Sequence, residues 1–244
     1  MSADEPAGNP AQSHPDFDAQ VNGIAALGDP VRRSLYRFVV AQTAPVTREQ
    51  AAAGVGVARH IAKFHLDRLL EEGLLDVTYA RPAGRSGPGA GRPAKLYQRS
   101  ARALAVSLPP REYELAGRLL AHAITTAERD GVPVGQALGE AAREVGLSIG
   151  RRARQQAGSR PSRASLVAAT NTVLSECGYE PRADAEGVTL ANCPFHALAQ
   201  DYTDLVCGMN LELMTGVVEG LETSGLEARL EPCPGQCCVR LAPM

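Results

Sequence analysis

Cysteine is the residue type with the most uneven distribution in this chain. The 244-residue sequence has six cysteines, and none precedes residue 177. They are Cys177, Cys193, Cys207, Cys233, Cys237 and Cys238. In a reducing compartment, clustered cysteines are more often metal ligands or redox thiols than structural disulfides. Because thiolates select iron–sulfur clusters, zinc or copper(I) over hard cations, the C-terminal part is predicted to bind such a group or to respond to oxidation.

The spacing of these cysteines argues against two common thiol sites. No two of them form a Cys-x-x-Cys pair, and thirteen residues separate Cys193 from Cys207. The pattern therefore matches neither a zinc ribbon nor a thioredoxin-like site. Five of the six cysteines, all except Cys177, lie instead in three segments, at 192–196, 205–208 and 232–238. A site built from them would form only when three distant elements fold together.

Alternation along the last strand distinguishes the two adjacent cysteines of the tail. Val239 and Leu241 are apolar and Arg240 is charged. Period-two alternation therefore predicts that Cys237 points inward and Cys238 outward.

A preferred ligand set follows from this alternation. The preferred ligands are Cys193, Cys207 and Cys237. The candidates for a further ligand are Cys233, Cys238 and His196. Cys177 lies at the end of a predicted helix and is expected to be a small buried hydrophobic residue. The alternative for the whole set is cysteines that pack without a ligand.

The elements that carry the cysteines are predicted to be a mixture of helices and strands. Apolar spacing and Pro/Gly breaks predict helices at 112–130, 134–157, 163–177 and 202–221, a strand at 187–190 and a final hairpin around 234–235. The first two helices are amphipathic and rich in small residues, which suits close helix–helix packing.

The N-terminal half has the order of a winged helix–turn–helix. Asp29 and Pro30 are typical of a helix start, and Thr47 with Gln50 predicts a capping box. Helices are expected at about 47–53 and 58–72, with Gly73 ending the second. Strands are expected at 74–80 and 94–98, around a glycine- and proline-rich tip at 81–91.

The candidate DNA-binding residues lie on the helix at 58–72 and on the tip that follows. With Ile61 and Phe64 taken as inward-facing, the exposed residues are Arg59, His60 and Lys63, and Arg85 and Arg92 on the wing are expected to contact phosphate or the minor groove. No acidic residue occurs between Asp76 and Arg111, which favours attraction of phosphate. The alternative is a solvated helix face.

Two neighbours in the same helix are given structural roles. His65 is expected to be a partly buried histidine and not a base reader. Arg68 is expected to form a surface ion pair with Glu71 or Glu72.

Three segments resemble the ArsR-type winged-helix regulators of bacteria. They are Ala-Leu-Gly-Asp-Pro-Val-Arg-Arg at 26–33, Phe-His-Leu-Asp-Arg-Leu-Leu-Glu-Glu-Gly-Leu-Leu at 64–75 and Gly-Arg-Pro-Ala-Lys-Leu-Tyr at 91–97. The match as a whole covers about residues 20–100. The resemblance implies a homodimer that reads an inverted repeat in double-stranded DNA.

The chain as a whole resembles the SufR family of iron–sulfur-sensing repressors. The resemblance rests on Cys193 near a strand end, Cys207 before a helix with Leu and Glu, and a closing Gly-x-Cys hairpin at Cys237, behind the winged helix. It implies that the cysteines hold an iron–sulfur cluster, of the 4Fe-4S or 2Fe-2S type. Zinc bound by the same residues, or thiols that respond to oxidation, is the alternative.

The predicted fold class is α+β. Its parts are a disordered leader at 1–17, a winged helix–turn–helix at 18–108, a helical connector and dimerisation region at 109–160 and a C-terminal α/β cysteine-bearing sensor domain at 161–244. The polar leader and the absence of long apolar runs predict a cytoplasmic protein with no membrane partner. No phosphate loop, nucleophile elbow or paired helix carboxylates are found, so no enzymatic activity is expected. The remaining alternative is an interaction module that does not bind DNA.

Overall fold

The computed structural model describes residues 17–80, 93–184, 187–222 and 225–244. The chain divides into two compact units, one comprising His14–Val106 and one containing Ser107–Met244. Each unit is described by itself.

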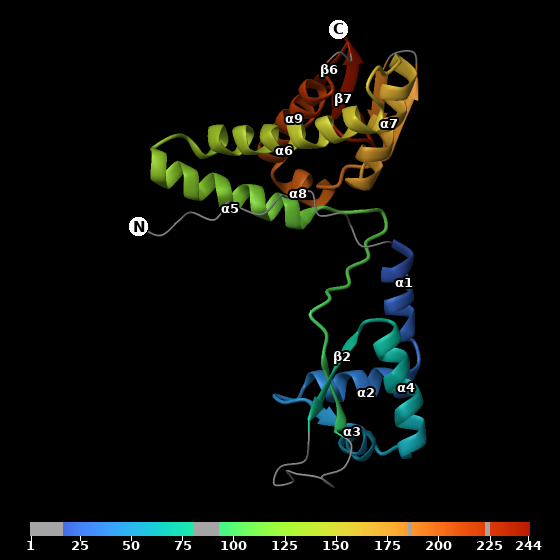
Figure 1. Cartoon of the computed structure of the whole chain (residues 1–244). Coiled ribbons are helices and arrows are strands. Elements are labelled where there is room, and N and C mark those ends of the chain that lie inside the picture. The colour runs from blue at the N-terminus through green and yellow to red at the C-terminus, as the bar shows by residue number, and fades with distance from the viewer. Residues whose placement is uncertain (1–16, 81–92, 185–186, 223–224) are drawn as a thin grey trace. The chain divides into compact units, whose positions relative to one another are not determined.

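The N-terminal unit contains four helices and a small antiparallel sheet among its described residues (Figure 1). The helices are α1 (Phe17–Ala26), α2 (Pro30–Val40), α3 (Arg48–Val55) and α4 (Arg59–Glu71). The strands are β1 (Val46–Thr47), β2 (Leu75–Ala80) and β3 (Ala94–Arg99), in the order β1-β3-β2. The two-residue strand β1 was not predicted from the sequence.

Local capping signals set the ends of these helices. The Asp29 side chain accepts a hydrogen bond of 2.9 Å from the backbone N–H of Arg32 at the start of α2. At the start of α3, Thr47 and Gln50 form the predicted capping box, with bonds of 2.8 and 3.1 Å. Gly73 has a φ of 68°, a left-handed conformation that favours glycine, directly after α4. These predictions are confirmed.

The buried face of α4 differs from the prediction. Its buried residues are Ala62, His65, Leu66 and Leu69. Ile61 is 38% exposed and Phe64 is 66% exposed, so the expectation that both face inward is wrong. Two sets of residues with helical spacing run along this helix. One set contains Ile61 and Phe64, and the other contains Ala62, Leu66 and Leu69. Helices α2 and α3 pack against α4, and the face that carries Ala62, Leu66 and Leu69 belongs to their common core.

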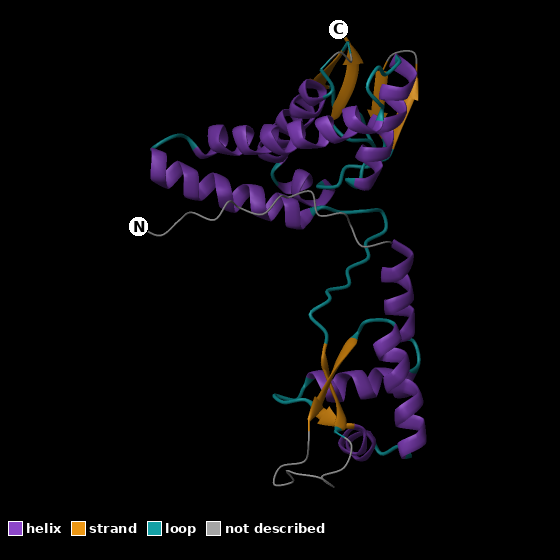
Figure 2. Cartoon of the chain, in the orientation of Figure 1, coloured by secondary structure: helices purple, strands orange, loops and turns teal. Residues whose placement is uncertain are grey.

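The C-terminal unit combines helices with a four-stranded antiparallel sheet (Figure 2). Its helices are α5 (Tyr113–Asp130), α6 (Val134–Gln156), α7 (Arg163–Glu176), α8 (His196–Asp201) and α9 (Thr203–Gly220). Its strands are β4 (Pro181–Asp184), β5 (Gly187–Leu190), β6 (Leu226–Leu230) and β7 (Val239–Pro243), in the order β4-β5-β7-β6. The sequence did not predict β4 or the short helix α8.

One hydrophobic core serves the whole of this unit. Leu119 of α5, Leu138 of α6 and Leu174 of α7 belong to the same buried cluster as Met214 of α9 and Leu241 of β7. The helices at 113–156 and the cysteine-bearing segments therefore pack as one body.

Helices α6 and α9 pack side by side at very short distance (Figure 1). Gly146 and Gly150 of α6 face α9, and Gly216 and Gly220 of α9 face α6. A Cβ atom at any of these four positions would overlap the backbone of the other helix. Glycine is required here because the two backbones touch. Arg143 of α6 also donates a hydrogen bond of 2.9 Å from Nε to Glu219 of α9.

Among the described helices, none combines the length and the apolar character needed to cross a membrane.

Candidate nucleic-acid interface and cysteine site

Helix α4 presents the predicted DNA-binding residues to solvent. Arg59, His60 and Lys63 lie exposed in its first two turns. Arg59 Nη2 lies 2.6 Å from Glu49 Oε1, and Lys63 Nζ lies 3.1 Å from Asp67 Oδ2. Exposed ion pairs of this kind contribute at most about 1 kcal/mol. Both cations are therefore available to exchange their carboxylate partners for phosphate or a base.

Lys63 belongs to a small charge network that links α4 to the sheet. Asp67 lies 3.1 Å from Lys63 and also 3.1 Å from Lys95 of β3. Partial burial raises the pKa of the Asp67 carboxyl, but the hydrogen bonds from Lys95 and Lys63 outweigh it and lower the pKa overall. The ionised carboxylate thus ties the middle of α4 to the strand that returns from the wing.

An open hollow of 540 Å³ runs along the exposed face of α4. It is lined by Arg32, His60, Lys63, Phe64, Asp67, Arg68 and Glu71. Sequence reasoning missed Phe64 as a surface residue because its apolar character suggested the core. Arg68 pairs with Glu71 at 3.3 Å and also with Glu72, as predicted.

The other residues predicted for the N-terminal unit are His65, Arg85 and Arg92. His65 is buried against α2, where Arg32 Nε lies 3.5 Å from its Nδ1, which confirms the expectation of a buried histidine. Arg85 and Arg92 lie outside the described residues.

The cysteine site is assembled at one end of the C-terminal sheet. Cys193 follows β5, Cys237 and Cys238 precede β7, and Cys207 lies in the second turn of α9. The backbone N–H of Cys237 donates to the carbonyl of Leu190 across 2.9 Å, which continues the pairing of β5 with β7. This pairing brings Cys237 next to the loop that holds Cys193.

Four of the cysteines lie in two pairs whose thiols are close enough to share a hydrogen bond. Cys237 pairs with Cys193, and Cys207 pairs with Cys238. The charge of Cys193 also acts on Cys207, so the two pairs are neighbours. Cys207 and Cys237 are buried, whereas Cys193 and Cys238 are half-buried.

The hydrogen-bond pattern places negative charge on Cys193. The Cys237 thiol lowers the pKa of Cys193 from 9.0 to about 7, although burial opposes this, and the N–H of Phe195 and the charge of Arg111 contribute further. The pKa of Cys237 is raised because it donates to Cys193 and is buried. Burial, followed by the hydrogen bond to Cys238, raises the pKa of Cys207 to about 12.

A buried amide supports the first pair. Asn210 of α9 is 2% exposed, and its Nδ2 donates to Cys237 Sγ across 3.1 Å. Its Oδ1 accepts a hydrogen bond of 2.5 Å from the hydroxyl of Tyr179. Burial keeps the pKa of Tyr179 well above its ordinary value, so the hydroxyl remains a donor.

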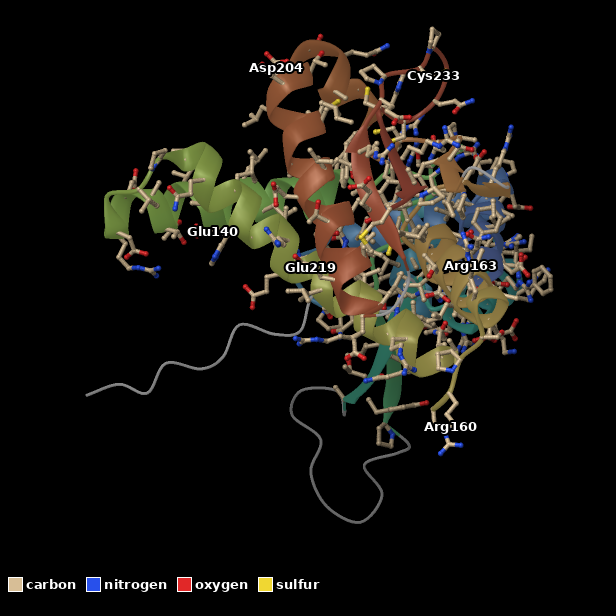
Figure 3. The ribbon with its side chains drawn as sticks, turned by 90° about the horizontal axis from the view of Figure 1, so that it is seen from above. Glu140, Arg160, Arg163, Asp204, Glu219 and Cys233 are labelled. Carbon is tan, nitrogen blue, oxygen red and sulfur yellow. The ribbon has the colours of Figure 1, made fainter. Side chains whose placement is uncertain are left out.

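The other candidate ligands stand apart from these pairs. Cys233 lies exposed on the turn between β6 and β7 (Figure 3). His196 is exposed at the start of α8. Cys177 caps the end of α7, where burial raises the pKa of its thiol to about 11. The predicted ligand candidates Cys233 and His196 therefore take no part in the two thiol pairs.

The four paired thiols have the chemistry of a metal site but not its arrangement. Within the described part of the chain, no three or more His, Cys, Asp or Glu side chains are arranged ready to hold a metal ion. The chemistry of the donors still fits a thiolate-bound group, because all four are sulfur and three N–H donors point at them, from Phe195, Val239 and Asn210. Binding of such a group would require the thiols of each pair to lose their protons and to bond to the metal in place of one another.

Comparison with known protein families identifies a helix-turn-helix domain at residues 27–78. This segment runs from the end of α1 into β2 and contains the whole of α4. No curated protein and no solved structure matches the chain. The N-terminal unit thus carries a helix-turn-helix domain, which indicates a DNA-binding transcription regulator.

Proposed function

We propose that this protein is a homodimeric transcription regulator whose affinity for an inverted-repeat operator depends on the state of Cys193, Cys207, Cys237 and Cys238. One observation carries the proposal. Cysteines from three separated segments meet in two neighbouring pairs, in a chain that also carries a helix-turn-helix domain.

The DNA-reading part of the proposal rests on α4. The second helix of a helix–turn–helix enters the major groove with its early residues at the base edges. Arg59 would donate two hydrogen bonds to guanine, and Lys63 would contact a base or phosphate. Phe64 adds an exposed apolar ring suited to the methyl group of thymine.

We favour an iron–sulfur cluster as the group held by the cysteines. Cys193, Cys207 and Cys237 would be ligands, and the contact of Cys238 with Cys207 makes Cys238 the best candidate for the fourth. N–H donors directed at ligating sulfurs are typical of cluster sites and tune their reduction potential. When bound, the cluster would supply a centre that is sensitive to iron and oxygen. Zinc on the same thiolates is the alternative metal.

Thiol oxidation is a second candidate function, favoured by the Cys193–Cys237 contact and the lowered pKa of Cys193. A peroxide would oxidise the Cys193 thiolate to a sulfenic acid and release hydroxide. The Cys237 thiol would then attack this sulfur, forming the disulfide and releasing water. Two electrons pass from the two sulfurs to the peroxide in this sequence.

The packing of α9, α6 and α5 would transmit a movement at the cysteine site to the rest of the C-terminal unit. Cys207 and Asn210 lie near the start of α9, whose later turns touch α6 through four glycines (Figure 3 marks Asp204 and Glu219 on this helix). A shift of α9 therefore moves α6, and α6 packs against α5.

Purification without oxygen distinguishes these functions. A brown protein that contains iron and labile sulfide and bleaches in air is expected. Cys193→Ser is expected to abolish iron binding, and Cys233→Ser, in the exposed turn, to retain it. A colourless protein with stoichiometric zinc would refute the cluster. A metal-free protein that loses two thiols on treatment with peroxide would favour the second candidate.

A mobility-shift assay with the isolated operator tests the DNA-reading part. The wild type is expected to bind more weakly or more tightly once the cysteine site is emptied or oxidised. Unchanged DNA binding after Arg59→Ala combined with Lys63→Ala would refute the assigned surface.

A further inference from the structure

Residues 110–112 are hydrogen-bonded to the loop that carries Cys193. Arg111 Nη1 lies 2.6 Å from Asn192 Oδ1 and 2.9 Å from the backbone carbonyl of Cys193. The backbone N–H of Glu112 donates to the carbonyl of Pro194 across 3.1 Å. The loop is therefore bound on both sides of its cysteine.

Asn192 completes this arrangement from within the core. It is 7% exposed, and its Nδ2 donates to the carbonyl of Pro110 at 3.0 Å and to that of Gly178 at 2.6 Å. Its Oδ1 accepts from Arg111. One buried side chain thus joins the end of α7, the Cys193 loop and the segment before α5.

Arg111 follows the boundary between the two units by only a few residues. The chain leaves β3 at Arg99, passes from the N-terminal to the C-terminal unit between Val106 and Ser107, and reaches Arg111 just before α5. A movement of the Cys193 loop would pull on the contacts of Arg111 and so on the start of the segment that leads back to the helix-turn-helix domain.

We propose that Arg111, held by Asn192, is the positioning residue that couples the state of Cys193 to DNA affinity. The inference rests on the proposed function and adds the residue through which regulation passes. The half-buried Arg111 contacts the Cys193 carbonyl and not its sulfur, so it is not a ligand. Its charge also favours the Cys193 thiolate, so the test compares proteins with equal iron content.

The test uses the full-length protein in two states, one reconstituted with iron and sulfide without oxygen and one metal-free and reduced. The ratio of the operator Kd values in these states measures the coupling, and ratios of roughly 5- to 150-fold are typical of regulated proteins. Arg111→Met removes the donors and keeps the aliphatic stem. Arg118→Met is the matched control, because Arg118 is an exposed residue of α5 that pairs with Glu114.

In protein reconstituted to the iron content of the wild type, Arg111→Met is expected to reduce the ratio to about 1, and Arg118→Met to keep the wild-type ratio. Hydrogen exchange provides an independent measurement. The backbone N–H of Glu112 should change its protection between the two states in the wild type and not in Arg111→Met.

Three outcomes would overturn the inference. A wild-type ratio retained by Arg111→Met shows that the coupling takes another route. Loss of iron from Arg111→Met, repeated in the charge-preserving Arg111→Lys, shows that Arg111 is needed only to build the site. A wild-type protein that binds iron but has a ratio of 1 refutes the proposed regulation and, with it, the role of Arg111.

Discussion

The side-chain amide of Asn210 donates a hydrogen bond to Sγ of Cys237 across 3.1 Å inside the core of the C-terminal unit. The Tyr179 hydroxyl donates to the oxygen of the same amide. This second bond orients the amide, because it leaves only Nδ2 to face the sulfur. Two buried polar side chains therefore hold one thiol in place.

This chain of hydrogen bonds predicts non-additive stability changes. Asn210→Leu leaves the buried Tyr179 hydroxyl without its partner and is expected to lower the free energy of unfolding by roughly 1–3 kcal/mol. Adding Tyr179→Phe removes the orphaned hydroxyl, so the double variant should be no less stable than Asn210→Leu. Urea denaturation of the single and double variants measures this coupling. Strictly additive losses would show that the two side chains act independently.

The close contact of α6 and α9 predicts strong intolerance of Gly150. Gly150→Ala places a methyl group against the backbone of α9 and is expected to destabilise the protein by about 3 kcal/mol. The control is Gly117→Ala in the second turn of α5, where an added Cβ meets nothing within 4 Å. Alanine there should stabilise the helix by up to about 1 kcal/mol. Thermal unfolding of both variants measures the difference, and equal melting temperatures would contradict the packing.

The lowered pKa of Cys193 predicts a distinct pH dependence of alkylation. Only the thiolate reacts, so labelling of Cys193 in metal-free protein should increase as pH rises through about 7. Cys177, with a pKa of about 11, should remain almost unlabelled below pH 8.5. Iodoacetamide labelling followed by peptide mass spectrometry gives both rates. Since the hydrogen bond from Cys237 is the main cause of the shift, Cys237→Ala should move the Cys193 midpoint upward; an unchanged midpoint would exclude that cause.

The exposed face of α4 predicts separate effects of its cationic and apolar residues. Arg59→Ala should weaken operator binding by about 5- to 150-fold, since a bidentate base contact is worth roughly 1–3 kcal/mol. Phe64→Ala should cause a smaller loss, confined to operators with thymine at the contacted position. Fluorescence anisotropy with operator variants measures both. Arg118→Ala in the C-terminal unit is the control, and an equal loss there would remove the assignment to α4.

The sequence predicted most elements of the N-terminal unit because their signals are local. Asp29, the Thr47–Gln50 capping box and Gly73 act on backbone groups within a few residues, so each can be recognised without knowing the fold. The buried stripe of α4 was predicted wrongly for the opposite reason. Both stripes satisfy helical spacing, and only the packing against α2 and α3 selects one.

The cysteine site shows the same division between local and long-range causes. By itself, the sequence determined that the thiols lie in the C-terminal part, that three segments bring them, and that Cys237 rather than Cys238 is buried, since strand alternation is a local property. Only the tertiary structure decided that Cys193 pairs with Cys237 and Cys207 with Cys238, and that Asn210 and Arg111 support them. These contacts depend on the register of β5 with β7 and on the glycine-mediated approach of α9 to α6, which join residues far apart in the chain.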